Sequence, residues 1–321
     1  MAVESGTDIA AVGEAADRVR ANVARVIVGA EEAIDLTLVA MLCHGHALIE
    51  DVPGTGKTLL AKALARSIGA EFRRIQFTPD LTPSDVTGIH YYNQKAGEFE
   101  FRPGPLLANI VLADEINRAT PRTQSALLEA MAERQVTVDA ETLALPSPFL
   151  VLATQNPIEL EGTFPLPEAQ LDRFLVRLRM GYPEAADEDA ILVRFQSGDP
   201  LESLQPVIAA SDIERLSTAV GEVRCEASIR RYLIAITRAS REHSAVELGA
   251  SPRASLALFH ASRAYAATRG RDYVLPDDIQ RLAVPVLSHR IILNTQSRLR
   301  GRDAESLVRE IVEEIPVPVE G

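Results

Sequence analysis

The sequence of 321 residues predicts an α/β fold, in which a five-stranded parallel sheet with β-hairpin insertions is followed by a small all-α domain. Five short apolar runs, separated by helical or loop segments as is typical of buried parallel strands, predict the sheet. They are residues 47 to 50, Phe72 to Phe77, Ile110 to Leu112, Phe149 to Ala153 and Phe174 to Leu178. A chain of this length exceeds one comfortable hydrophobic core. We therefore expect two domains, 1–182 and 183–321, with a hinge near Tyr182-Pro183.

Helical periodicity flanks the sheet region on both sides. One helix is expected before a break at Val28-Gly29, and a second from Glu31. After Glu184 only helical patterns occur, and Asp303 to Glu314 is predicted to form a last amphipathic helix. The apolar residues that carry these patterns are Ile9, Val12, Ala16, Val19, Val23, Ile191, Leu192, Phe195, Ile229, Leu233, Ile236, Leu256, Phe259, Tyr265, Ile279 and Leu282.

Two segments alternate with a period of two and predict hairpins inserted into the sheet scaffold. In Gly88 to Phe101, aromatic and acidic residues alternate after a turn at Lys95-Ala96-Gly97. In Gln135 to Leu145, Val136 and Val138 are expected to face Leu143 and Leu145 across the turn Asp139-Ala140-Glu141.

Composition and charge argue against several classes of protein. The net charge of -12 disfavours a broad electrostatic grip on nucleic acid. No run approaches the roughly 18 apolar residues of a membrane helix, and the first ten residues do not resemble a signal peptide, so we expect a cytoplasmic protein without a membrane span. Cys43 and Cys225 are far apart and should be reduced and buried. The six histidines lack metal-binding spacing.

The strongest motif is DVPGTGKT, Asp51 to Thr58, between an apolar run and a predicted helix. It matches the P-loop pattern except that Asp51 replaces the first glycine. Glycines let backbone N–H groups surround phosphate, and the lysine neutralises its charge. We therefore expect ATP and Mg²⁺ here, and the context argues against a bland turn. The residues expected to bind the nucleotide are Pro53, Gly54, Thr55, Gly56, Lys57, Thr58 and Leu59, with Thr58 also a magnesium ligand.

Two further strand ends carry polar groups that suit hydrolysis. The run Asn109 to Glu115 ends in two carboxylates, of which Asp114 would face the metal and Glu115 would act as the general base. Asn156 follows the next strand and would position the attacking water. Acidic strand caps and Asn-Pro turns are the ordinary structural alternatives. In combination with the P-loop, the acidic pair favours a catalytic site.

The order of these motifs resembles that of the AAA+ ATPases. More narrowly, the chain is similar to the MoxR family through EDVPGTGKT (Glu50 to Thr58), DEINRATPRTQSALLEAM (Asp114 to Met131), ATQNP (Ala153 to Pro157) and LPEAQLDRF (Leu166 to Phe174). The similarity covers essentially the whole chain and implies a P-loop sheet with two hairpin insertions and a helical lid. Many MoxR sequences resemble this one at Asp51, and we expect its carboxylate to point away from the phosphates, so that replacing it with glycine leaves ATP affinity nearly unchanged.

The resemblance also assigns roles to single residues. Arg173 corresponds to the arginine finger that completes a neighbouring subunit's site, which implies a homo-oligomeric ring, expected to be a hexamer. Without the family, Arg173 reads equally well as a surface arginine paired with an acid. Arg253 resembles the sensor arginine that reports on the γ-phosphate, and Val28-Gly29 resembles the segment that holds adenine. Arg118 either crosses the subunit interface or braces its own loop.

The resemblance implies an ATP-driven remodelling motor. Its expected role is chaperone-like maturation or assembly of a client protein complex, sometimes with metal or cofactor insertion, alongside a separate partner that carries a von Willebrand factor A domain. The alternatives are a nucleic-acid motor of the helicase or restriction-translocase type, a magnesium-chelatase-like motor, and a nucleotide switch that does not hydrolyse ATP. The acidic charge disfavours the first, and the intact set of catalytic residues disfavours the switch.

Overall fold

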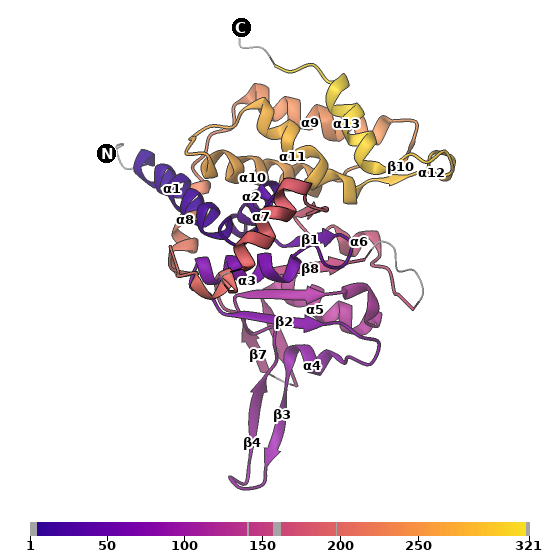
Figure 1. Cartoon of the computed structure of the whole chain (residues 1–321). Coiled ribbons are helices and arrows are strands. Elements are labelled where there is room, and N and C mark those ends of the chain that lie inside the picture. The colour runs from indigo at the N-terminus through magenta and orange to yellow at the C-terminus, as the bar shows by residue number, and fades with distance from the viewer. Residues whose placement is uncertain (1–4, 140, 157–161, 197, 319–321) are drawn as a thin grey trace.

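The computed structural model describes residues 5–139, 141–156, 162–196 and 198–318 (Figure 1). Its centre is a parallel five-stranded sheet with the strand order β2-β5-β8-β1-β9. The strands are β1 (Ala47–Glu50), β2 (Phe72–Gln76), β5 (Ile110–Asp114), β8 (Leu150–Gln155) and β9 (Val176–Leu178). Each coincides with one of the apolar runs, so the predicted sheet is confirmed.

Helices cover both faces of the sheet, which explains why β1, β5 and β8 are apolar and buried along most of their length. The edge strand β2 instead exposes Arg73 and Arg74. Because successive side chains of a strand point to opposite faces, neighbouring residues enter different clusters. Ile49 packs in one cluster with α3 (Lys57–Ser67), whereas Leu48 packs in the other with α5 (Pro121–Glu133). Because β1, β5 and β8 run parallel to one another, their carboxyl ends meet at one edge of the sheet.

Short helix α4 (Pro83–Thr87) lies near the β3–β4 hairpin, whereas most of the remaining helices gather on the other side of the sheet, as Figure 1 shows. They are α1 (Ser5–Val23), α2 (Glu31–Leu42), α7 (Ala185–Phe195), α8 (Asp212–Val220), α9 (Ala227–Glu242), α10 (Pro252–Thr268), α11 (Pro276–Leu287), α12 (Thr295–Leu299) and α13 (Ala304–Glu314). The break after α1 and the last amphipathic helix occur as predicted. A short antiparallel pair, β10 (Val246–Leu248) with β11 (Ile292–Leu293), corrects the prediction of helices alone. Strands of two and three residues are too short for an alternation to be read.

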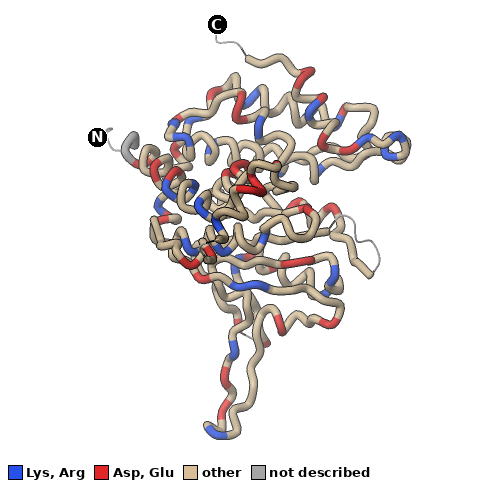
Figure 2. Tube along the Cα trace, in the orientation of Figure 1, with Lys and Arg blue, Asp and Glu red and all other residues tan. Residues whose placement is uncertain are grey.

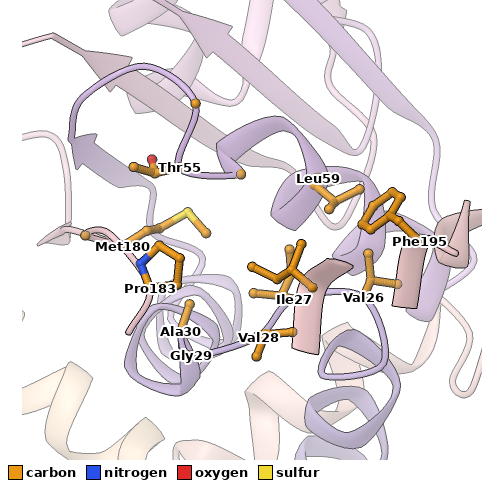
Figure 3. Close-up of a pocket in the computed structure, with 14 residues that line it drawn as sticks. Val26, Ile27, Val28, Gly29, Ala30, Thr55, Leu59, Met180, Pro183 and Phe195 are labelled. Carbon is orange, nitrogen blue, oxygen red and sulfur yellow. The ribbon is translucent and has the colours of Figure 1, made fainter. Parts of the chain in front are cut away.

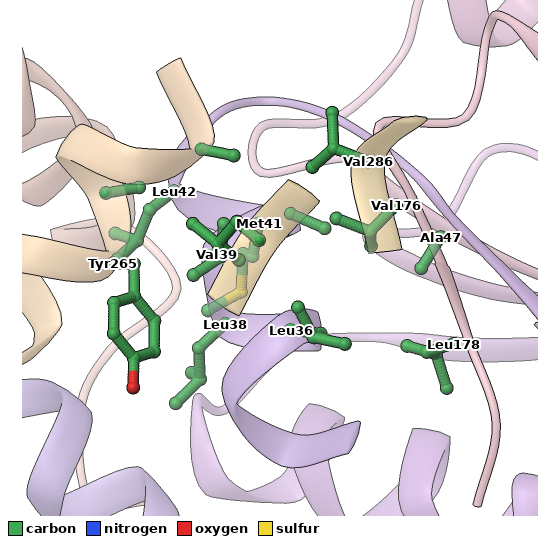
Figure 4. Close-up of a cluster of buried hydrophobic side chains, with 14 of the residues drawn as sticks. Leu36, Leu38, Val39, Met41, Leu42, Ala47, Val176, Leu178, Tyr265 and Val286 are labelled. Carbon is green, nitrogen blue, oxygen red and sulfur yellow. The ribbon is translucent and has the colours of Figure 1, made fainter. Parts of the chain in front are cut away.

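One continuous apolar cluster joins the sheet to these helices. Figure 4 shows Leu36 and Val39 of α2 on one side and Val176 and Leu178 of β9 on the other, with Val286 of α11 next to Val176. Helix α1 likewise contacts α8 and α10, which come more than 180 residues later in the chain. Because the buried core crosses the expected boundary, the division into residues 1–182 and 183–321 stays a prediction.

Both predicted hairpins are present. Strand β3 (Gly88–Asn93) pairs with β4 (Glu98–Pro103), and Figure 1 shows this hairpin extending away from the body of the molecule. Strand β6 (Gln135–Val138) pairs with β7 (Glu141–Ala144), placing Val136 opposite Leu143 as expected. The partner of Val138 is Glu141 rather than a leucine, because only two residues connect the strands. Ala140, in the predicted turn, lies outside the described residues.

The described helices, the charged residues and the two cysteines all bear on what the composition predicts. None of the helices in the described parts of the chain combines the length and the apolar character that crossing a bilayer requires. Figure 2 shows basic and acidic residues interspersed along the chain. The two cysteines are not bonded to each other; Cys225 is buried and Cys43 is partly buried.

Candidate functional site

A pocket lies where the P-loop faces the α1–α2 connection, the segment after β9, and helix α7 (Figure 3). Met180, Ile27 and Leu59 point toward its interior. The residues that line it are Val26, Ile27, Val28, Gly29, Ala30, Gly54, Thr55, Gly56, Leu59, Met180, Gly181, Pro183, Ile191 and Phe195. Phosphate-binding backbone therefore borders an apolar space, which is the combination that a nucleotide with a flat base requires.

The P-loop has the backbone that its glycines permit. Gly54 and Gly56 have φ angles of 89° and 91°, in the left-handed region that residues with a Cβ rarely adopt. Helix α3 begins at Lys57, and no side chain caps its first turn. Its leading N–H groups and its dipole are thus available to an anion. Thr58 lies in this first turn, and Pro53 lies in the loop before it.

The ammonium group of Lys57 is folded back onto the loop. Its Nζ donates to the carbonyl oxygens of Asp51 at 3.1 Å and Val52 at 2.6 Å. Partial burial lowers the pKa of Lys57, and the charges of Asp51, Asp114 and Glu115 oppose this shift. The ends of β1 and β5 are therefore close enough for their carboxylates to act on the lysine electrostatically.

Asp114 is held by two neighbouring strands. The hydroxyl of Thr154 on β8 donates to its Oδ1 at 2.6 Å, and Nη2 of Arg74 on β2 lies 2.6 Å from its Oδ2. Thr154 also accepts from the backbone N–H of Glu115 at 2.8 Å. One hydroxyl thus fixes both acidic residues. The sequence did not reveal the roles of Thr154 and Arg74, because they depend on which strands are neighbours.

Glu115 has a strained backbone and a braced side chain. Its φ is 58°, unusual for a residue other than glycine and often found at functional sites. Its Oε2 accepts from Nε2 of Gln76 at 2.9 Å and lies 3.0 Å from Nε of Arg118. In this structure Arg118 therefore contacts the loop of its own chain. Asn156 follows β8, next to β5 in the sheet, and is buried; Pro157, which completes the ATQNP motif, lies outside the described residues.

The site could hold Mg²⁺ with few protein ligands. Among the described residues, no cluster of three or more His, Cys, Asp or Glu side chains forms a metal cage. Thr58 and Asp114 offer oxygen donors, and Mg²⁺ commonly takes one or two protein oxygens while phosphates and water fill its remaining positions. The residues present therefore fit a magnesium ion that arrives with a nucleotide.

Arg173 and Arg253 lie together, and neither lines the pocket. Arg173 is exposed after α6 (Glu168–Leu171), and its guanidinium donates to the carbonyl oxygen of Leu128. Nη1 of Arg253 at the start of α10 lies 3.5 Å from Oδ2 of Asp172, the residue before Arg173. The side chain of Arg253 is 73% exposed. Both arginines are thus exposed at one part of the surface.

Sequence reasoning missed half of the pocket wall. It named Val28, Gly29 and the P-loop, but not the segment after β9 or the inner face of α7. Ile191 and Phe195 had been assigned to an ordinary amphipathic helix, and they do lie at helical spacing. In the structure no residue of α7 is buried, and Ile191 and Phe195 line the pocket instead. The sequence alone does not show this.

Comparison with known proteins places this geometry in a family. Residues 46–176 match the ATPase family associated with various cellular activities (AAA), and residues 238–311 match an AAA lid domain. The chain is 55% identical over 299 residues to the uncharacterized protein YeaC of Bacillus subtilis, covering 93% of each. It is 41% identical over 306 residues to chaperone MoxR1 of Mycobacterium tuberculosis, covering 92% of this chain and 81% of that protein.

A solved structure agrees with this relationship. The crystal structure of a candidate ATPase from Cytophaga hutchinsonii is 38% identical, with a TM-score of 0.91 over 98% of both chains. A relative named MoxR1 that exceeds 40% identity, together with the AAA and lid regions, agrees with the P-loop, the acidic strand end and the hairpins described above. The chain belongs to the MoxR family of AAA+ ATPases.

Proposed function

We propose that this chain hydrolyses ATP with Mg²⁺ at the pocket beside the P-loop. The observation that carries the proposal is the meeting of Lys57, Asp114 and Glu115 at one edge of the sheet, close enough for both carboxylates to act on the pKa of the lysine. Phosphoryl transfer needs a cation for the phosphates, a carboxylate for the metal and a group that activates water. Membership of an ATPase family supports the same activity.

Each residue has a separate task in this proposal. Lys57 exchanges its backbone carbonyl partners for oxygens of the β- and γ-phosphates. Thr58 and Asp114 would hold Mg²⁺, which neutralises charge on the phosphates. Glu115 accepts a proton from the attacking water, and Asn156 orients that water. Ile191 and Phe195 exclude solvent from the base.

A neighbouring subunit completes the site in the second part of the proposal. Arg173 and Arg253 are exposed and do not line the pocket of their own chain. We assign Arg173 to the arginine finger, which stabilises the charge on a neighbour's γ-phosphate, and Arg253 to sensing that phosphate. Such a head-to-tail contact closes into a ring, for which we propose six subunits.

The proposed output is chaperone-like remodelling of other proteins. One relative is named chaperone MoxR1, which supports a role in the maturation or assembly of a client protein complex. Metal or cofactor insertion, a separate partner with a von Willebrand factor A domain, and a cytoplasmic location belong to the same proposal. The β3–β4 hairpin, with the exposed aromatic residues Tyr92 and Phe99 near its tip, is positioned to contact a client.

Replacing the general base tests the proposal. We expect Glu115→Gln to bind ATP with wild-type affinity and to lower turnover at least 100-fold, because the amide cannot accept the proton. Lys57→Ala should abolish nucleotide binding. Equilibrium binding of a fluorescent ATP analogue and phosphate release at ring-forming concentrations measure both. Glu222→Gln, a change at an exposed residue that does not line the pocket, is the control.

Two outcomes would contradict the proposal. Undiminished turnover by Glu115→Gln would remove that residue from catalysis, and no turnover by the wild-type ring would favour a nucleotide switch. The trapped Glu115→Gln variant also serves as bait in native extract. The absence of any ATP-dependent client would count against the chaperone-like role, whereas turnover stimulated by DNA would favour a nucleic-acid motor.

A further inference from the structure

Asp51, the residue that departs from the P-loop pattern, binds the segment that leads out of the core. Its side chain is almost fully buried, at 8% relative exposure. The carboxylate Oδ2 accepts from the backbone N–H groups of Met180 at 2.9 Å and Gly181 at 2.8 Å. We call Met180–Pro183, which joins β9 to helix α7, the connector. The acidic side chain therefore ties the connector to the start of the P-loop.

The main chain of the same residue faces the lysine. Nζ of Lys57 donates to the carbonyl oxygen of Asp51 at 3.1 Å, and Oδ1 of Asp51 accepts from the N–H of Val52 at 2.8 Å. When Lys57 turns to a phosphate, the carbonyl oxygens of Asp51 and Val52 lose their donor. Any adjustment of the backbone at Asp51 moves a side chain that carries two hydrogen bonds to the connector.

Only a carboxylate fits these three donors. Both oxygens act purely as acceptors, and together they receive N–H groups from Val52, Met180 and Gly181. A buried charge persists only where it is well paired, which these bonds provide. In an asparagine the NH₂ group would replace one of the two acceptor oxygens, so at least one of these N–H groups would face another donor. A glycine, as in the general P-loop pattern, would offer the connector nothing.

We propose that Asp51 is a positioning residue that transmits the phosphate state at Lys57 to the connector, and through it to α7 and the helical lid. This inference rests on the proposed nucleotide site and extends it. Asp51 is not among the residues that line the pocket, and its Oδ2 faces the connector. Its role is to make the angle between core and lid depend on what the P-loop holds.

Hydrogen exchange of the connector tests this coupling. ADP and the slowly hydrolysed analogue AMP-PNP, each with Mg²⁺, both fill the base and ribose regions. Both should therefore protect the N–H groups of Met180 and Gly181 by direct covering to the same extent, and comparing the two nucleotides removes that effect. In the wild type, the exchange rate of peptides that span the connector should differ several-fold between the two nucleotides. In Asp51→Asn this difference should vanish, while the affinity for each nucleotide stays within about three-fold of wild type.

A matched carboxylate controls for general loss of stability. Asp278 is also buried, pairs with Arg271, and accepts from the N–H of Leu275, far from the connector in sequence. Asp278→Asn should keep the difference between ADP and AMP-PNP. A second variant, Asp51→Gly, removes the side chain and places no amide donor against the N–H groups. It can be used for the same measurement if the buried amide of Asp51→Asn prevents folding.

Steady-state kinetics give an independent readout. Both Asp51 variants should lower kcat about ten-fold with little change in KM, because nucleotide still binds and only the domain response is lost. A wild-type difference in connector exchange that persists in both variants would overturn the coupling. A loss of nucleotide affinity beyond ten-fold would instead place Asp51 in the binding site and overturn it as well. Failure of the wild type to hydrolyse ATP would refute the proposed function, yet the exchange measurement would still decide the coupling.

Discussion

His46, immediately before β1, is a buried side chain with both ring nitrogens engaged. Its Nδ1 accepts from the backbone N–H of Val151 at 3.0 Å, and its Nε2 donates to the carbonyl oxygen of Met131 at 3.1 Å. This arrangement requires the neutral ring, since a second proton would oppose the N–H of Val151. Burial, aided by the charge of Arg134, lowers the pKa of His46 to about 3.

The pKa of His46 predicts a pH dependence of stability. The unfolded histidine takes up a proton below its ordinary pKa of 6.5, whereas the folded one does not until about 3. The contribution to stability is thus complete above pH 6.5 and is lost as the pH falls toward 3. Between pH 6.5 and 5 the loss is about 2 kcal/mol. Urea unfolding of the wild type and of His46→Asn at both pH values measures the difference between their slopes.

His44 supplies the control for this measurement. It is exposed and has a φ of 50°, a conformation that asparagine tolerates. His44→Asn is therefore the control for replacing an exposed histidine in the same segment, whereas His46→Asn should lose about 2 kcal/mol less than the wild type on acidification. Equal slopes for all three proteins would show that His46 does not stay neutral in the native state.

At the same scale, the sequence predicted the residues that belong to a motif and missed those that only adjacency defines. Lys57, Asp114 and Glu115 each stand at a strand end or helix start, positions that can be read along one chain. Gln76 and Arg74 reach the acidic pair because β2 neighbours β5. Strand order is set by packing between distant segments, so no local pattern contains it.

At the scale of elements, the 3₁₀ turn after α11, η3 (Ser288–Arg290), braces the loop that carries Arg173. Arg290 is 4% exposed in its side chain, and its Nε lies 2.7 Å from Oδ1 of Asp172. Its Nη2 donates to the carbonyl oxygens of Asp172 and Phe174, at 3.2 Å and 2.7 Å. His289 reaches the same Phe174 carbonyl oxygen at 3.0 Å. The helical lid thus sets the position of this loop.

Removing this brace should be costly. Arg290→Met keeps the length of the side chain but leaves the buried side of Asp172 and the carbonyl oxygen of Asp172 without their donor, so we expect a loss of about 3–5 kcal/mol. Chemical unfolding measures it. The control is Arg224→Met, which breaks an exposed pair with Asp272 and should cost about 1 kcal/mol or less. Similar losses in the two variants would contradict the bracing role.

The elements themselves were predicted where their patterns were long. The five sheet strands and both hairpins follow from apolar runs and alternation, while the β10–β11 pair is too short to leave either signal. Helix α7 shows the opposite case, since its periodicity predicted a helix correctly but not the face that it turns to the pocket. Periodicity identifies an apolar face, and only the three-dimensional arrangement says what that face covers.

At the scale of the whole molecule, the residues proposed for the site occupy two places on the surface. Lys57 and the pocket lie at the P-loop, whereas Arg173 and Arg253 are exposed and lie together outside the pocket. From the sequence alone, Arg173 reads equally well as a surface arginine paired with an acid, and the ring enters only through the family resemblance. A single chain contains both halves of such an interface, but the contact between them is a property of the assembly.

Mixing two inactive variants tests this division. Arg173→Ala retains the P-loop and lacks the finger, whereas Lys57→Ala retains the finger and lacks the P-loop. Each alone should show almost no phosphate release. In a random one-to-one mixture, about a quarter of the interfaces join an intact P-loop to an intact finger, so turnover should return to about a quarter of wild type if sites act independently. Mixing Arg173→Ala with the double variant Lys57→Ala/Arg173→Ala restores no such interface and should stay inactive. If the first mixture stays inactive although size-exclusion chromatography shows that the two variants assemble together, Arg173 does not serve a neighbour's site.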